Sequence, residues 1–197
     1  MSSAGTLAGD ESLRLFLALR LPGDVLDALE RWIGDELTGE PTDEFTQVRR
    51  VPRDHLHITL AFLGARPARE LPAILGALRS AVSASTPFPL EPSGYRETRS
   101  VGMVVLRDPT GGAAQLAREL HQQLERIGVY RREARTWLPH VTVLRFRDRP
   151  RLRPPPPAFA TFAPSDTAAF LSRLHPAGAR YEVLGVVPLG SPIGQSQ

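Results

Sequence analysis

Two four-residue segments carry the side chains best suited to chemistry in this 197-residue chain. They read His-Ile-Thr-Leu at 57–60 and His-Val-Thr-Val at 140–143. In a β-strand, side chains alternate between faces, so each His and its Thr are expected to share one face. Imidazole moves protons near neutral pH, and a hydroxyl can hold a phosphoryl oxygen. The pattern predicts an acid–base site around one phosphate, built from His57, Thr59, His140 and Thr142.

The two segments occupy matching places in the chain. Before each lies an apolar run, then a turn containing Pro and Gly, then an amphipathic stretch; the apolar runs are 13–21 and 101–107. The turn prolines, Pro22 and Pro109, precede their histidines by 35 and 31 residues. This spacing indicates a diverged internal duplication. We expect an α+β fold with two pseudo-twofold-related lobes, mainly antiparallel sheets, and outer helices around a central cleft.

Periodicity assigns the remaining elements. Helical spacing of apolar residues predicts helices over 22–37, 68–84 and 115–127. Alternation predicts strands over 13–21, 46–51, 56–63, 88–97, 101–106, 140–146, 158–162, 167–174 and 180–187. Four prolines at 154–157 predict a rigid surface connection, because Pro fits neither a helix interior nor a central strand. His121 falls within the third helix, and we expect it on the surface.

The size of the chain favours a single domain over 13–190, preceded by a flexible lead at 1–12 and followed by a tail at 191–197. No apolar run is long enough to span a bilayer, and the first residues lack the basic start and apolar core of a signal peptide. We therefore expect a cytoplasmic monomer without membrane contact.

Composition excludes several reaction classes. The chain has no Cys, and all 24 of its basic residues are Arg. Thiolate nucleophiles and zinc–thiolate sites are therefore absent, as are a P-loop lysine, a Schiff base and the lysyl-adenylate of ATP-dependent nucleic-acid ligases.

The arginines are concentrated around the second His-x-Thr segment. Eight of them lie between residues 131 and 153 against two acidic residues. A run of this kind can collect phosphates, since guanidinium groups match phosphate oxygens, or it can be a solvated loop. The first interpretation predicts RNA contacts beyond the reacting end from Arg147, Arg149, Arg151 and Arg153.

A metal site is the alternative use of the histidines. His55 and His57 form a His-x-His pair to which His140 could add a third ligand. Apart from Asp54, no acidic residue lies near either segment in a ligand-like pattern. We therefore favour a site without metal.

Four stretches resemble the two-histidine phosphoesterases, in particular the RNA 2′,3′-cyclic phosphodiesterases, which are also called 2′-5′ RNA ligases. They are Arg-Leu-Phe-Leu-Ala-Leu-Arg-Leu-Pro at 14–22, His-Ile-Thr-Leu-Ala-Phe-Leu-Gly at 57–64, Pro-His-Val-Thr-Val-Leu-Arg at 139–145, and the segment 171–184. The resemblance implies two lobes around a cleft and no metal or nucleotide cofactor. It also implies hydrolysis of a 2′,3′-cyclic phosphate on RNA, tRNA fragments included, to a 2′-phosphate. The same site would also join a 2′,3′-cyclic end to a 5′-hydroxyl without ATP.

The resemblance also assigns roles. His140 would act as general base and His57 as general acid, with Thr59, Thr142 and Arg145 on the phosphate. Arg145 has the opposite strand parity to His140, so it reaches the phosphate only from a strand end or through a bulge.

Two other functions fit the same residues: a non-catalytic RNA- or nucleotide-binding module, and a phosphodiesterase for small cyclic or 2′-5′-linked nucleotides. Two intact His-x-Thr segments argue against the first, because a binding module needs no proton-transfer groups. Only substrate tests separate the second.

Overall fold

The computed structural model describes residues 11–37, 48–175 and 178–190. The expected tail at 191–197 and nearly all of the expected lead at 1–12 lie outside these ranges, and β1 already begins at Ser12. The elements in chain order are β1 Ser12–Arg20, α1 Gly23–Glu36, β2 Arg49–Arg50, β3 His57–Pro67, α2 Leu71–Ser83, β4 Glu91–Glu97, β5 Val101–Arg107, α3 Gly112–Arg126, β6 His140–Arg145, β7 Asp166–His175 and β8 Gly178–Pro188, with 3₁₀ turns at Arg53–His55 and Ala68–Glu70.

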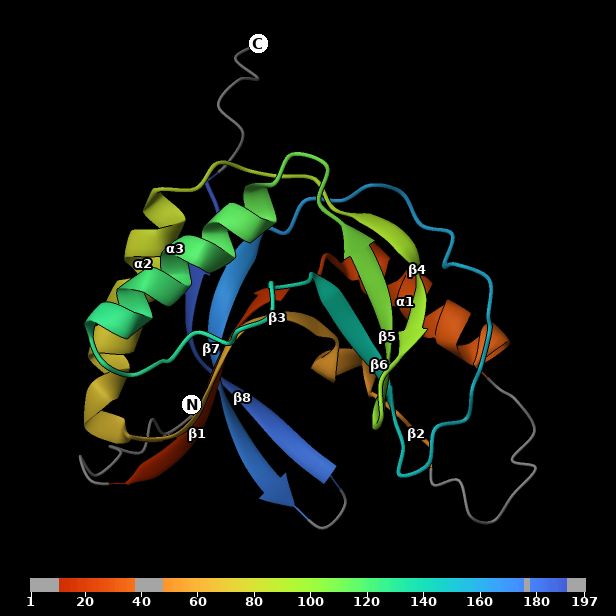
Figure 1. Cartoon of the computed structure of the whole chain (residues 1–197), viewed down its shortest axis with the longest axis horizontal. Helices are drawn as coiled ribbons and strands as arrows, with labels where there is room; N and C mark the ends of the chain where they lie inside the picture. The colour runs from red at the N-terminus through yellow and green to blue at the C-terminus, as the bar shows by residue number, and fades with distance from the viewer. Residues whose placement is uncertain (1–10, 38–47, 176–177, 191–197) are drawn as a thin grey trace, which may run out of the picture.

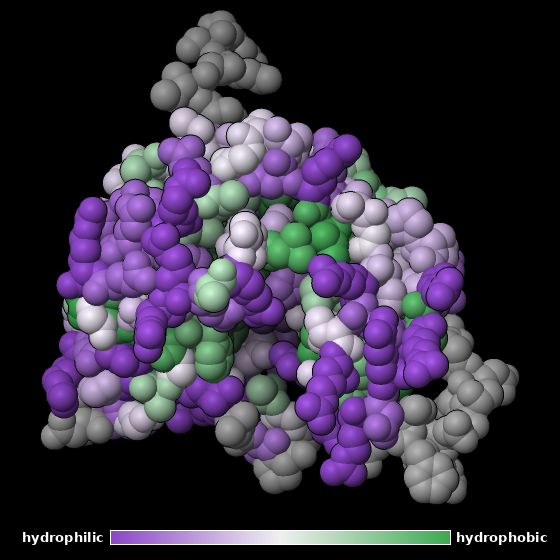
Figure 2. All heavy atoms as spheres, in the orientation of Figure 1, coloured by the Kyte–Doolittle hydropathy of each residue, from purple (hydrophilic) through white to green (hydrophobic). Residues whose placement is uncertain are grey.

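The strands form one mostly antiparallel sheet that consists of two halves. Its order is β4-β5-β6-β3-β1-β7-β8, and β2 pairs with β6 beside β3. The halves join where β3 meets β6, and in the described part of the chain the only ladder pair there is Ile58 with Val141. Beyond this pair the halves diverge, and the surface is hollowed between them (Figures 1 and 2). The expected bilobal α+β architecture around a central cleft is confirmed.

The helices cover the faces of the two halves that point away from the cleft (Figure 1). α3 packs on β3 and α2 on β8, behind the half that contains β1. α1 instead lies behind β4 and β5, where the Trp32 ring is 6.1 Å from that of Tyr95. α1 and α3, which precede the two His-x-Thr strands, thus each cover the half that contains the other segment, and α2 lies beside α3.

β1 shows how the sequence builds both faces of the sheet. Its odd-numbered residues from Leu13 to Leu19 are leucines with at most 1% exposure, and they form part of the main core. Phe16 and Ala18 point the other way and belong to a small second cluster with Ala168 and Phe170 on the cleft side. The long apolar run at 13–21 therefore reflects a strand buried on both faces.

The structure differs from the predicted elements in two strands. Of the stretch 46–51, residues 46 and 47 lie outside the described ranges, and within the rest only Arg49–Arg50 forms a strand. The stretch 158–162 makes only an isolated bridge, between Phe162 and Leu90. Leu90 and Phe162 exchange both of their backbone hydrogen bonds there, at 2.8 and 3.0 Å, and no other residue of 158–162 joins the pairing. None of the helices in the described ranges is long and apolar enough to cross a bilayer.

Candidate active site

The two His-x-Thr segments meet at the joint of the sheet. Ile58 and Val141, which pair there, are both buried in the main core. Their neighbours on either side therefore face the cleft. In an antiparallel pair, one step along each strand brings His57 beside Thr142 and Thr59 beside His140. The two imidazoles thus lie on one diagonal of a four-residue site, and the two hydroxyls on the other.

Each imidazole is held by a carbonyl two residues before it. His57 Nδ1 lies 2.7 Å from the His55 carbonyl oxygen, and His140 Nδ1 lies 2.8 Å from that of Leu138. A carbonyl oxygen only accepts, so Nδ1 carries the proton in both rings. The Nε2 atoms are then the ones left to exchange protons with a ligand.

His57 is surrounded by aromatic rings. The ring centroids of Phe16, Tyr181 and Phe170 lie 4.8, 5.7 and 6.0 Å from that of His57. Burial among them is the main cause that lowers the pKa of His57 to about 4; repulsion from Arg145 and the neighbouring imidazoles adds to it, and the hydrogen bond from Nδ1 opposes it. The imidazole is therefore neutral at pH 7, and its Nε2 lies 3.1 Å from the Thr59 hydroxyl.

The lowered pKa predicts a pH-dependent stability. The pKa of His57 is 6.5 in the unfolded chain and about 4 in the folded protein. At a pH between these two values, His57 is protonated in the unfolded chain and neutral in the folded protein. We expect the free energy of unfolding to fall by about 2–3 kcal/mol from this source between pH 7 and 4.5. Urea unfolding at the two pH values measures it. His57→Gln should lose this part of the pH dependence, while the matched variant His140→Gln should retain it. Equal dependence in wild type and His57→Gln would contradict the prediction.

A β-bulge brings Arg145 into the site. Along β5, Met103 pairs with Thr142 but Gly102 pairs with Leu144, so Val143 is an extra residue in β6. Val143 and Leu144 are both fully buried, and the alternation therefore shifts by one position. Arg145 emerges on the face of His140 and Thr142, as its influence on the pKa of His57 also indicates. Of the two routes that the strand parity allows, a strand end or a bulge, both are present, because Arg145 is also the last residue of β6.

The first segment contains the same irregularity. Leu60 is the extra residue between the pairs Thr59–Ala18 and Ala61–Leu17. Phe62 takes the place that corresponds to Arg145, five positions after its histidine, and it is 48% exposed. Phe62 has no local signal in the sequence that marks it as a site residue, because it lies within an apolar strand. The repeat therefore supplies an apolar ring on one side of the site and a cation on the other.

Two side chains bind the backbone of β3 at its bulge. His121 Nε2 lies 2.8 Å from the Leu60 carbonyl oxygen, and the Trp137 indole N–H donates to the Thr59 carbonyl oxygen at 2.9 Å. The expectation that His121 lies on the surface is wrong: it is 7% exposed and stacks on Tyr130. Ala117, Leu120 and Leu124 complete a buried stripe at helical spacing with it, which is the signal that the sequence offered.

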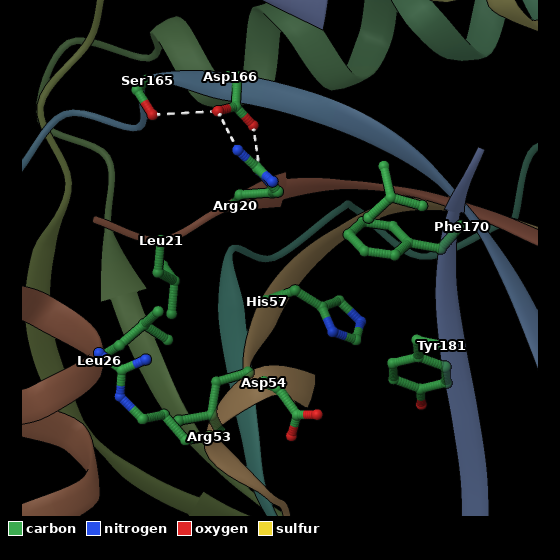
Figure 3. Close-up of a pocket in the computed structure, with 12 residues that line it drawn as sticks. Arg20, Leu21, Leu26, Arg53, Asp54, His57, Ser165, Asp166, Phe170 and Tyr181 are labelled. Carbon is green, nitrogen blue, oxygen red and sulfur yellow. Dashed lines mark hydrogen bonds and ion pairs between the residues drawn. The ribbon is translucent and has the colours of Figure 1, made fainter. Parts of the chain in front are cut away.

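A pocket of about 240 Å³ adjoins His57 (Figure 3). Phe170 and Tyr181 stand beside the imidazole, and the far end is polar. There Arg20 donates two hydrogen bonds to Asp166, at 2.7 and 2.9 Å, and Ser165 donates a third. The pocket thus combines aromatic walls with a fixed polar end, as nucleoside sites do.

The arginine-rich segment after β6 leads away from the cleft. Glu97, 8% exposed, accepts hydrogen bonds from Arg149 Nε and from the backbone N–H groups of Arg151 and Leu152. Further on, the Pro155 carbonyl accepts from Trp32 of α1. The segment therefore passes to the outer face of the sheet. The side chains of four arginines are exposed along this segment: Arg147, Arg149, Arg151 and Arg153.

The ligand set considered for a metal does not assemble. Across the described ranges, no group of three or more His, Cys, Asp or Glu side chains lies close enough to hold a metal ion. The ring of His55 instead lies 4.3 Å from that of Tyr181. The donor chemistry present at the joint is that of imidazole, hydroxyl and guanidinium groups, which suits a phosphate.

Comparisons with known proteins agree with this geometry. The chain is 29% identical over 177 residues to an RNA 2′,3′-cyclic phosphodiesterase of Escherichia coli (strain K12), covering 88% of this chain and 95% of the relative. It is 31% identical over 194 residues to the protein of that name from Thermus thermophilus, covering 94% of each. The crystal structure of E. coli LigT complexed with 3′-AMP superimposes with a TM-score of 0.76 at 27% identity, covering 92% of this chain and all of that one. The family model of the 2′-5′ RNA ligase superfamily matches residues 22–177, and the chain belongs to that superfamily.

Proposed function

We propose that this protein hydrolyses the 2′,3′-cyclic phosphate at the 3′ end of RNA and leaves a 2′-phosphate. The observation that carries the proposal is the pair of imidazoles on one diagonal of the joint, each with Nδ1 held by its own backbone. The names of the E. coli and T. thermophilus relatives support the same activity. RNA is then the partner, and the reaction needs neither metal nor nucleotide cofactor.

The proposed reaction is one in-line displacement at phosphorus. His140 Nε2 takes a proton from water as the water oxygen attacks. The bond from phosphorus to the 3′ oxygen breaks, and His57 Nε2 gives that oxygen its proton. Thr59, Thr142 and Arg145 hold the non-bridging oxygens and stabilise their growing charge. With a 5′-hydroxyl in place of water as the attacking group, the same steps in the same direction join the cyclic end to a second RNA through a 2′-5′ linkage, and the 3′ oxygen again leaves with the proton from His57.

If His57 is the general acid, the bound substrate has to raise its pKa. With a pKa of about 4, His57 is unprotonated at pH 7, whereas a general acid must carry a proton. An anionic phosphate between the two rings favours the charged imidazole and so raises its pKa. Binding of the substrate would therefore load the acid with the proton that it later gives up.

The pocket beside His57 suits the terminal nucleoside. A base can stack on Phe170 or Tyr181, and each such contact typically contributes about 1–3 kcal/mol without selecting a sequence. The pair of Arg20 and Asp166 would meet the polar edge of the base or the ribose. With the nucleoside in this pocket, its cyclic phosphate reaches the joint.

The direct test uses EDTA-treated protein and an oligoribonucleotide that ends in a 2′,3′-cyclic phosphate. We expect undiminished turnover and a product with a 2′-phosphate, because the described site residues supply proton transfer and charge by themselves. Product ends are mapped by phosphatase and ligase sensitivity. Loss of activity on chelation that zinc or manganese restores would refute the metal-free reaction. A 3′-phosphate product would refute the assigned leaving group.

Trp137 is expected to position the first segment against the second. It precedes His140 by three residues and binds the Thr59 carbonyl, so it ties the two halves where they share a single ladder pair. Trp137→Phe keeps an aromatic ring but removes this donor, and we expect kcat to fall about tenfold with KM changed less than threefold. The matched control is Trp32→Phe, which removes a donor to Pro155 at the outer face and should leave kcat within twofold. Equal losses in both variants would assign Trp137 a role in stability alone.

A further inference from the structure

Two arginines stand directly opposite each other at the edge of the site. Arg49 of β2 pairs with Arg145 of β6, and directly opposite residues of an antiparallel pair project from the same face. Arg145 faces the cleft, so Arg49 faces it too. Like charges at this separation, with Cβ atoms about 5 Å apart, destabilise a sheet unless an anion lies between them.

A third arginine lies on the same face, two strands away. Met103 of β5 pairs with Thr142 on one side and with Arg96 of β4 on the other. Arg96 is therefore in line with Thr142 across the sheet, at about 10 Å from it. Its neighbour Tyr95 points to the opposite face, where it packs on Trp32 of α1. We call Arg49 and Arg96 the basic strip.

The strip has no acidic partner among the residues that the structure describes. Within the described residues, no acidic side chain pairs with Arg49, Arg96 or Arg145. Many arginines elsewhere do have such partners: Arg20, Arg53, Arg66, Arg107, Arg132, Arg135, Arg149 and Arg173. Hydrophilic side chains gather over the lower ends of β4, β5 and β6 beside the hollow (Figure 2). Positive charge left unpaired on a concave face attracts a polyanion.

We propose that the basic strip binds the phosphodiesters of the RNA chain that precede the reacting end. This rests on the proposed function, in which the terminal nucleoside fills the pocket on the His57 side of the joint. A cyclic end has neighbours only on its 5′ side, and a chain that leaves the pocket across the other half passes over Arg49 and Arg96. The protein is accordingly selective for RNA ends over mononucleotides. The Arg147–Arg153 segment, which passes to the outer face, contributes less.

The test compares three variants that each lose two charges. Arg49→Gln/Arg96→Gln removes the strip, Arg151→Gln/Arg153→Gln alters the outer segment, and Arg79→Gln/Arg118→Gln alters exposed sites on α2 and α3. Binding of a fluorescein-labelled 12-nucleotide RNA with a 2′-phosphate end is followed by anisotropy across salt concentrations. We expect the strip variant to flatten the plot of log K against log salt concentration by about 1.4, which is about 0.7 per lost contact. The outer-segment variant should flatten it by less, and the α2/α3 variant should leave it unchanged.

Turnover gives the second readout. The ratio of kcat/KM for a cyclic-ended 12-nucleotide RNA to that for cytidine 2′,3′-cyclic phosphate should fall about tenfold in the strip variant, and remain at the wild-type value in the α2/α3 variant. A flattened slope in the outer-segment variant with none in the strip variant would overturn the proposal, as would an unchanged ratio. Wild type that binds the RNA with the expected slope but cleaves neither substrate would refute the proposed function and leave the strip as an RNA site.

Discussion

His57→Ala and His140→Ala are each expected to lower kcat/KM for a 2′,3′-cyclic phosphate by about 10²–10⁴. Each replacement removes one of two proton transfers that belong to a single displacement. The double variant should therefore lose far less than the product of the two single losses. Steady-state kinetics with cytidine 2′,3′-cyclic phosphate measures all three variants. Near-wild-type activity in either single variant would show that this imidazole is structural.

The residual activity of the single variants assigns the roles. When His57 is removed, a rate limited by His140 as base must rise with pH, because the base works only unprotonated. When His140 is removed, a rate limited by His57 as acid must fall as pH rises through its pKa, which is about 4 in the free protein. Profiles of kcat/KM report the free enzyme, so this value is the relevant one. If both pH profiles had the opposite slopes, His57 would be the general base and His140 the general acid.

Arg145→Gln is expected to lower kcat by about 10²-fold. Its guanidinium is the one charged group that β6 brings to the phosphate, and charge stabilisation in the transition state acts on kcat rather than on KM alone. Arg145→Lys should recover part of the loss, because it restores the charge without the planar fork. Circular dichroism and urea unfolding verify that the variants fold. A change in KM with unchanged kcat would place Arg145 in substrate binding only.

The site pairs were predictable because the signal is local. A histidine and a threonine two residues apart in an apolar strand share a face whatever the rest of the chain does, and His57 with Thr59 and His140 with Thr142 do so. The three helices also follow from their own periodicity. The packing of the helices does not follow from their periodicity, because α1 covers β4 and β5 rather than the strands of its own repeat.

What the sequence missed depends on contacts between distant residues. The sequence Val-Thr-Val-Leu-Arg at 141–145 does not indicate which residue forms the bulge. The pairing of β6 with β5 determines it. Arg49 and Arg96 carry no local signal, since only cross-strand pairing through β6 and β5 places them beside the site. The RNA contacts predicted for the arginines after β6 stay a prediction; the path of that segment along the outer face depends on its distant partners Glu97 and Trp32.

The extra residues at Leu60 and Val143 also determine how the two halves curve. A bulge bends its strand and increases the local twist, and each one lies directly after the threonine of its segment. β3 and β6 consequently bend apart just past their single shared pair, which opens space for a phosphate. Deleting Val143 would leave Arg145 four positions after His140, still on the cleft face of a regular strand. Such a deletion would straighten β6 while keeping every catalytic side chain. It would thus separate the effect of the sheet's curvature from the effect of the side chains that the sheet carries.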